Sequence, residues 1–178
     1  PSLPRGLVPL LFLAASPVSL PAQADHDHHT EARIGRVAFA TTCASSVQSR
    51  FESAVALLHS FWYDEAAAAF EDVTRGDSAC SLAYWGAAMS RLHPLWTPPT
   101  PAEEAAGLAA ADRAMRTSRP GTRERHYAEA IFGFFSNPGH RDFRTRIFAW
   151  ESAMAAVVRQ HPGDDEARLF HGLSQIAA

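Results

Sequence analysis

The stretch "LLHSFWYDEAAAAFEDV", residues 57–73, sets four ring side chains within five positions, directly before a run of alanines. Upstream of it, apolar residues from Val47 to Trp62 recur at helical spacing and form one stripe. Asp64 begins a second amphipathic run that continues to Val73. The stretch therefore predicts two helices joined by a tight turn.

The aromatic residues of this stretch allow two interpretations, a binding site or the packing of the predicted hairpin. Large aromatic side chains at helical spacing usually belong to a core, because each removes much apolar surface from water. We therefore expect Phe61, Trp62 and Phe70 to pack the hairpin, with the alanines letting its helices approach closely. The roles of His59 and Tyr63 stay open.

The same helical period continues from Ser45 almost without a break. A hydroxyl N-cap, a proline at the first helical position and a glutamate three residues after the cap mark the start of one helix at Thr100-Pro101-Ala102-Glu103. No window alternates with the period of a strand. The sequence predicts an all-α chain of six helices and part of a seventh, in the windows 47–62, 64–76, 82–92, 100–115, 122–135, 143–158 and 164–178.

Composition and motifs argue against several functions. Hydrophobic residues make up 47% of the chain and charged residues 20%, with a formal net charge of -3, so nothing in the overall charge favours nucleic acid. The arginines around "RERH", residues 123–126, are expected to form a solvated helix face. No nucleophile elbow, zinc-protease motif or phosphate-binding glycine loop is present, which predicts a protein that is not an enzyme and needs no cofactor.

The N-terminal residues resemble an export signal. Arg5 supplies a positive charge, residues 7–15 a short apolar core, and Ala22-Gln23-Ala24 a cleavage site. We expect residues 1–24 to be a signal peptide and the mature protein to be periplasmic or secreted, without membrane association after cleavage; a retained anchor is the alternative. Residues 25–44 are predicted to be a polar, histidine-rich linker ending in an apolar docking segment around Val37 and Phe39.

The two cysteines take their interpretation from export. In an oxidising compartment, Cys43 and Cys80 are candidates for a disulfide, which would close a loop of about 37 residues and stabilise the fold by roughly 3–4 kcal/mol. The alternative is a pair of small buried thiols. Two distant cysteines without a CxxC spacing do not support a metal site.

An internal period appears when the helices are compared. Ala54 and Ala88 are 34 residues apart, and Arg50 and Tyr84 share that offset. Ser78 occupies the turn to the next unit, ten residues before Ala88, and Pro162 precedes Gly172 by the same interval. A small residue at this point lets the two helices of one unit approach closely.

On these motifs the chain resembles the tetratricopeptide-repeat (TPR) family. The resemblance is carried by "SFWYDEAAAAFEDV" with "SLAYWGAAM", and by "VVRQHPGDDEARLFHGLS". It implies stacked helix-turn-helix units in a right-handed α-solenoid over residues 45–178, about three units, with a further repeat or cap expected beyond the C-terminal one. "LLHSFWYDEA" with "CSLAYWGAAMSRLHPLW" further resembles exported bacterial TPR proteins of unassigned function. The chain departs from the pattern at Arg50, at Trp150 and in the insertion "HPLWTPPT".

The resemblance implies that the first helix of each unit lines a concave groove that binds a protein or peptide. The residues expected to contribute are Arg50, His59, Tyr84 and Arg91. Trp96, in the proline-rich loop, is expected to be exposed and to contact the partner, whereas Trp85 is expected in the core.

Two other functions stay open. A periplasmic metal- or cofactor-binding protein could use His59 and His93, which are 34 residues apart and would lie about 10 Å apart in stacked units. The simpler interpretation is that each of these two histidines caps backbone carbonyls at a helix C-terminus. The N-terminal "DHDHH" could contribute His26, His28 and His29 to a metal site, with a solvated linker as the alternative. Finally, the chain could be the helical accessory domain of a longer enzyme.

Overall fold

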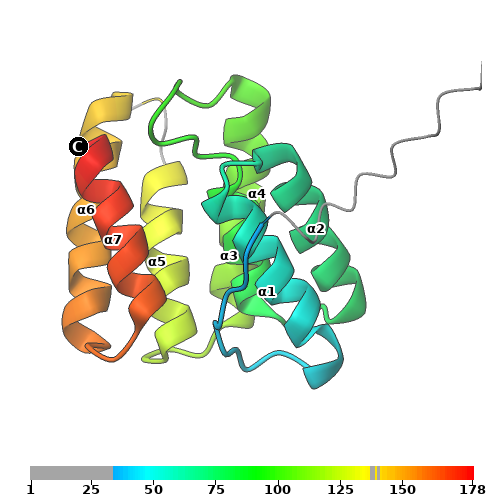
Figure 1. Ribbon diagram of the computed structural model, residues 1–178. Helices are drawn as coiled ribbons and strands as arrows, with labels where there is room; N and C mark the ends of the chain where they lie inside the picture. The colour runs from blue at the N-terminus through cyan, green and yellow to red at the C-terminus, as the bar shows by residue number, and fades with distance from the viewer. Residues whose placement is uncertain (1–33, 137–138, 140) are drawn as a thin grey trace, which may run out of the picture.

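The computed structural model describes residues 34–136, 139 and 141–178. Within them the chain is all-α, as predicted, with no strand. Figure 1 shows the helices standing side by side as successive hairpins. Their bounds are α1 (Ser45–His59), α2 (Tyr63–Gly76), α3 (Ser81–Met89), α4 (Pro101–Thr117), α5 (Arg123–Phe135), α6 (Phe143–Gln160) and α7 (Asp165–Ala177).

The first helix is shorter than its apolar stripe predicts. It ends at His59 because the next two amide groups turn back on it: Phe61 N–H donates to the carbonyl of Leu58 (3.0 Å) and Trp62 N–H to that of Leu57 (3.1 Å). This is the Schellman arrangement of a helix C-terminus, which places one residue in the left-handed region. Here that residue is Phe61, with φ 59°.

The later helices begin on side-chain caps. The Thr100 side chain accepts from the amide of Glu103, and the Glu103 carboxylate accepts from the amide of Thr100 at 2.7 Å, which confirms the predicted capping box. Thr122, Asp142 and Asp164 cap α5, α6 and α7 in the same way. These caps satisfy amide groups that lack an intrahelical partner and so fix where each helix starts.

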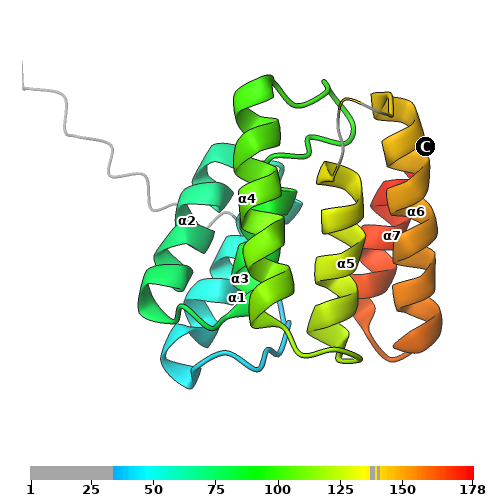
Figure 2. The ribbon, with the colours of Figure 1, turned by 180° about the vertical axis from the view of Figure 1, so that it is seen from behind.

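The helices form two layers. Each helix packs against the next one in sequence, and α3 also packs against α1 and α5. The odd-numbered helices α1, α3, α5 and α7 therefore make one layer, which we call the inner layer. Figure 2 shows α4 and α6 towards the viewer from the other side, with α3 and α7 behind them.

An aromatic cluster fills the inner layer. It contains a fully buried ring from each odd-numbered helix: Phe51, Trp85, Tyr127 and Phe170. Trp85 lies at the centre, with ring centroids 5.1 Å from Tyr127 and 4.9 Å from Phe170, both edge-to-face. These pairs join α3 directly to α5 and α7, and edge-to-face pairs add to the gain from burial.

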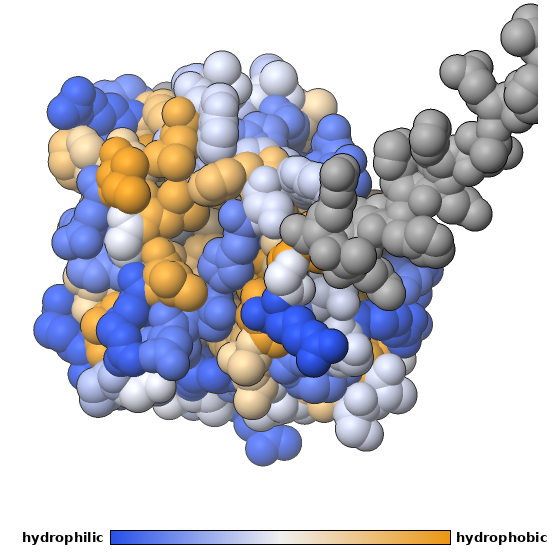
Figure 3. All heavy atoms as spheres, in the orientation of Figure 1, coloured by the Kyte–Doolittle hydropathy of each residue, from blue (hydrophilic) through white to orange (hydrophobic). Residues whose placement is uncertain are grey.

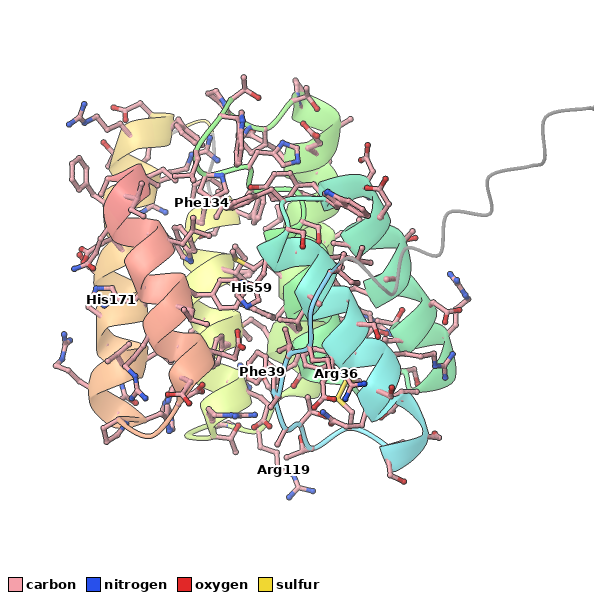
Figure 4. The ribbon with its side chains drawn as sticks, viewed as in Figure 1. Arg36, Phe39, His59, Arg119, Phe134 and His171 are labelled. Atoms are coloured by element: carbon pink, nitrogen blue, oxygen red, sulfur yellow. A yellow bond between two sulfur atoms is a disulfide. The ribbon has the colours of Figure 1, made fainter. Side chains whose placement is uncertain are left out.

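The segment before α1 completes this cluster. Phe39 is buried, with its ring 5.5 Å from those of Phe51 and Tyr127, and the Arg123 guanidinium lies 5.1 Å above it. The Gln48 side chain donates to the Phe39 carbonyl at 2.9 Å. Figure 4 shows Phe39 in the seam between α1 and α7. Residues 34–44 are thus held against the inner layer.

A disulfide between Cys43 and Cys80 ties this segment to the start of α3. The adjoining amide of Ala44 donates to Asp77 at 2.8 Å, so a hydrogen bond holds the same place. Among the helices that the structure describes, none is both long and apolar enough to span a membrane.

Two glycines allow close helix contacts. A Cβ atom at Gly86 of α3 would lie 2.3 Å from the Phe70 ring of α2, and one at Gly107 of α4 would lie 2.4 Å from the Phe135 ring of α5. Any other residue at these positions would force a buried ring to move. Phe70 is fully buried, as the sequence predicts for the packing of the first hairpin.

Candidate functional site

Aromatic side chains gather at the end of the molecule where α1 and α3 finish and α2 and α4 begin, the upper end in Figure 1. The Phe61 and Trp96 ring centroids are 4.9 Å apart, and Tyr63 lies 5.9 Å from Trp96 and 4.4 Å from the His93 ring. Together with Trp62 these residues form a surface that we call the aromatic end.

Backbone strain is concentrated at this surface. Phe61 (φ 59°) and His93 (φ 47°) are the two non-glycine residues with positive φ in the described part of the chain. A bulky side chain in this region costs on the order of 1 kcal/mol or more, and such outliers cluster at functional sites. The fold therefore holds two rings at the aromatic end against a local preference.

Two hollows flank Phe61 and Tyr63, which line both. The first, of about 120 Å³, is the apolar pocket; Leu58, Met89 and Phe170 are among its other walls. The second, of about 470 Å³, is the acidic hollow, and its remaining lining residues are Trp62, Asp64, Glu65, His93 and Glu103. Figure 3 shows apolar side chains gathered over the upper part of α7 and between α7 and α1, framed by polar ones.

Three of the aromatic residues are open to solvent. Trp96 is 59% exposed, as the sequence predicts for the proline-rich loop. Phe61 is 41% and Trp62 39% exposed, so the prediction that they pack the first hairpin is wrong. The physical reason is the early end of α1, because the Schellman turn directs the residues after His59 away from the hairpin contact.

Tyr63 lies between the two hollows and lines both. Its hydroxyl is buried and has no hydrogen-bond partner among the described residues. Burial raises the pKa of Tyr63 to about 12, so the hydroxyl keeps its proton at neutral pH. An unpaired hydroxyl beside a pocket is a hydrogen-bond donor that a ligand could satisfy.

His59 lies between the apolar pocket and α7. Its Nε2 is 2.7 Å from the buried carboxylate of Glu166, and its ring stacks on Phe170 with centroids 5.0 Å apart. Figure 4 shows His59 in the seam between α1 and α7. The interpretation of His59 as a cap for helix carbonyls is therefore wrong, because its ring bonds a carboxylate of a distant helix.

This contact also describes the shape of the helical row. Helices packed side by side are separated by about 8–10 Å, so three steps in a straight row of odd-numbered helices would put α7 about 25–30 Å from α1. His59 nevertheless reaches Glu166 and Phe170 of α7. The row is therefore strongly bent, and its concave side is occupied by the aromatic cluster and Phe39.

The other residues predicted to line a concave groove turn towards the even-numbered helices. Arg50 forms an ion pair with Asp72 of α2 at 2.9 Å, and Arg91 lies 3.7 Å from Glu71 of the same helix. The Tyr84 hydroxyl accepts from Arg113 of α4 at 3.4 Å. Of the five partner-binding candidates, the structure brings His59 and Trp96 to the aromatic end or its edge, and the charge of Arg91 is close enough to Glu103 there to help lower its pKa. Arg50 and Tyr84 lie apart from it.

The metal-binding candidates His59 and His93 each contact a different carboxylate. His93 is 3.7 Å from Glu103 and His59 bonds Glu166, so the two histidines have different partners. The residues His26, His28 and His29 lie outside the described part of the chain. Within the described residues, no group of three or more histidine, cysteine or acidic side chains is arranged to hold a metal ion.

Sequence reasoning missed the contribution of α7. Glu166 and Phe170 position His59, and Leu169 and Leu173 line the apolar pocket. The 56% exposure of Leu169 adds to the open apolar surface. Periodicity places these residues on a helix, but it does not indicate that the first and last helices of the row meet.

A pair of histidines in contact joins α5 to the end of α6. Nδ1 of His126 and Nε2 of His161 are 2.9 Å apart. Burial lowers the pKa of His161 below its ordinary value of 6.5, and the His126 charge lowers it further, while Asp164 and Glu124 act in the opposite direction and Arg123 adds to the lowering. Two imidazoles at this distance share one hydrogen bond, so protonating both breaks it.

We expect the protein to lose stability as pH falls below about 6.5, because His161 binds a proton more readily in the unfolded chain than in the native one. Urea denaturation at several pH values between about 5 and 7 measures this. The variant His161→Asn should flatten the dependence. An equal slope in the variant and the wild type would show that the pair does not contribute.

Comparison with known proteins found no match to this chain. No family model matches it, and no curated protein or solved structure matches it either. What the structure establishes is a class, an all-α chain of successive helical hairpins.

Proposed function

We propose that this chain is an exported helical-repeat scaffold of the TPR type that binds a protein or peptide partner at its aromatic end. One observation carries the proposal: Phe61, Trp62 and Trp96 are exposed on a strained, well-packed support, while the inner layer is filled by the chain itself. Exposed, rigid aromatic side chains beside a pocket are typical anchors of protein interfaces.

The arrangement of the helices supports a repeat of this type. Successive hairpins pack in order, and α3 contacts both α1 and α5, as the first helices of neighbouring repeat units do. The small residues Ala54 and Ala88, at the same position of two successive units, are both fully buried. The proposal of export rests on residues 1–24 and Ala22-Gln23-Ala24, which lie outside the described residues.

The apolar pocket is smaller than the pockets that hold cofactors and drug-sized ligands, whereas the acidic hollow is not. Pockets for cofactors and drug-sized ligands occupy about 300–1,000 Å³. The apolar pocket has a volume of about 120 Å³, equivalent to about four water molecules, which suits one apolar side chain. Its rim carries the exposed side chains of Phe61 and Leu169, which would cover the residues on either side of such an anchor.

The proposal is tested with random peptides displayed on phage and selected against the full chain. Selected peptides are then synthesised with a fluorescent label, and their affinities are measured by anisotropy. We expect Trp96→Ala and Phe61→Gly to weaken binding at least about tenfold, which corresponds to about 1.4 kcal/mol. Phe61→Gly should not lower stability much, because glycine relieves the strain at φ 59°.

The matched controls are Arg50→Ala and Tyr84→Ala, which alter residues away from the aromatic end. We expect both to bind the selected peptides with wild-type affinity. Peptides that are weakened by these changes and not by Trp96→Ala would contradict the proposed location. Failure to recover any peptide that binds the wild-type chain would contradict the function.

A further inference from the structure

The acidic hollow carries more negative than positive charge. Three carboxylates line it, those of Asp64, Glu65 and Glu103, and its one basic lining residue is His93, at 3.7 Å from Glu103. Among the described residues, no arginine or histidine lies within ion-pair distance of Asp64 or Glu65. By contrast, Glu71 and Asp72, further along α2, both face arginines.

Local structure explains only part of the stabilisation of these carboxylates. Asp64 and Glu65 lie in the first turn of α2, where negative charge complements the helix dipole. The hydrogen bonds from Thr100 hold the pKa of Glu103 below its usual range. The charges of His93 and Arg91 also lower the pKa of Glu103 and so offset part of its charge. Asp64 and Glu65 have no such partner among the described residues, and they give the hollow a net negative potential.

Aromatic rings border the same hollow. Phe61, Trp62 and Tyr63 line it together with the carboxylates, and Phe61 and Trp62 are partly exposed to solvent. The face of an aromatic ring attracts a cation, and the attraction is strongest for tryptophan. Ring faces and carboxylates together favour an arginine or lysine side chain, whose apolar stem packs on rings while its charged group meets the acids.

The neighbouring apolar pocket indicates which kind of side chain lies next to that cation in the partner. Phe61 and Tyr63 line both hollows, so the two are separated by the thickness of a side chain. We propose that the partner is a peptide segment that places an arginine or lysine in the acidic hollow and an adjacent apolar side chain in the apolar pocket. This inference rests on the proposed function and names the chemistry of its partner.

The test uses the peptides selected against the full chain. We expect them to share an arginine or lysine next to an apolar residue. In the tightest peptide the basic residue is replaced by citrulline, which keeps the shape of arginine without its charge, or by norleucine in place of lysine. We expect the wild-type chain to bind the replaced peptide about tenfold more weakly.

A paired variant locates the effect. The double variant Asp64→Asn with Glu65→Gln should bind the basic peptide about tenfold more weakly than the wild type does. It should bind the basic and the neutral peptide with equal affinity. Glu71→Gln with Asp72→Asn removes the same charge from the same helix and should leave the preference for the basic peptide intact. Raising the sodium chloride concentration should reduce that preference in the wild type.

The outcomes separate this inference from the proposed function. Peptides without a basic residue, or equal binding of the basic and neutral peptides, would overturn the inference; the proposed function would then stand if Trp96→Ala still weakened binding. A preference that survives Asp64→Asn with Glu65→Gln would also overturn it. If Trp96→Ala did not weaken the binding of the selected peptides, both the inference and the proposed function would be contradicted.

Discussion

Replacing Trp85 with alanine should lower the free energy of unfolding by about 3–5 kcal/mol, which is a large part of the stability of an ordinary domain. Trp85 is fully buried and its ring contacts those of Phe39, Tyr127 and Phe170, so the change opens a cavity between three helices and the N-terminal segment. Urea denaturation followed by circular dichroism measures the loss.

Two further variants make this measurement specific. The Trp85 indole N–H is buried and has no hydrogen-bond partner within the described part of the chain, so Trp85→Phe should cost much less than Trp85→Ala. Trp96→Ala, which removes an exposed ring of the same kind, should change the free energy of unfolding by less than about 1 kcal/mol. A loss below about 1 kcal/mol for Trp85→Ala would contradict the aromatic cluster.

Phe39→Ala should be almost as damaging, with a loss of about 3–5 kcal/mol, although residue 39 lies outside every helix. Its ring is buried among Phe51, Trp85 and Tyr127 and beneath the Arg123 guanidinium. Thermal or urea denaturation of the variant measures the effect.

The control for Phe39→Ala is Arg36→Ala, an exposed position three residues earlier that should change stability by less than about 0.5 kcal/mol. Equal, small effects of the two changes would show that the segment lies loosely on the helices. A large effect of Phe39→Ala alone supports the segment as part of the core.

Much of the helical architecture could be predicted from the sequence. The apolar period located the seven helices of residues 34–136 and 141–178, and the Thr100 capping box fixed one helix start to the residue. Such features depend on residues close together in the chain. The end of α1 was predicted too late because its left-handed position is occupied by Phe61 and not by glycine, so the usual stop signal is missing.

The site was less predictable, because it depends on residues distant in the chain. Pairing of His59 with Glu166 joins positions 107 residues apart, and no period reveals it. Likewise, the family resemblance placed Arg50, Tyr84 and Arg91 on a groove, whereas ion pairs and hydrogen bonds turn them towards the even-numbered helices. The exposure of Trp96 was predictable, since it lies in a proline-rich loop.

Occupation of the inner layer changes where a partner is expected to bind. In an open row, the first helices of the units present their side chains to a groove. In this chain the corresponding space holds one ring from each odd-numbered helix, together with Phe39. The open apolar and aromatic surface lies instead at the aromatic end, around Phe61 and Trp96, and on the adjoining part of α7.

Amide hydrogen exchange of the full chain, with and without a saturating selected peptide, tests the central proposal most directly. We predict that the peptide slows exchange in residues 58–65, 92–96, 102–104 and 169–174, which form or adjoin the aromatic end. It should leave α6 and the later turns of α2 and α4 unchanged. Protection confined to α1 around Arg50 and to α3 around Tyr84, with none at residues 58–65 or 92–96, would contradict the account.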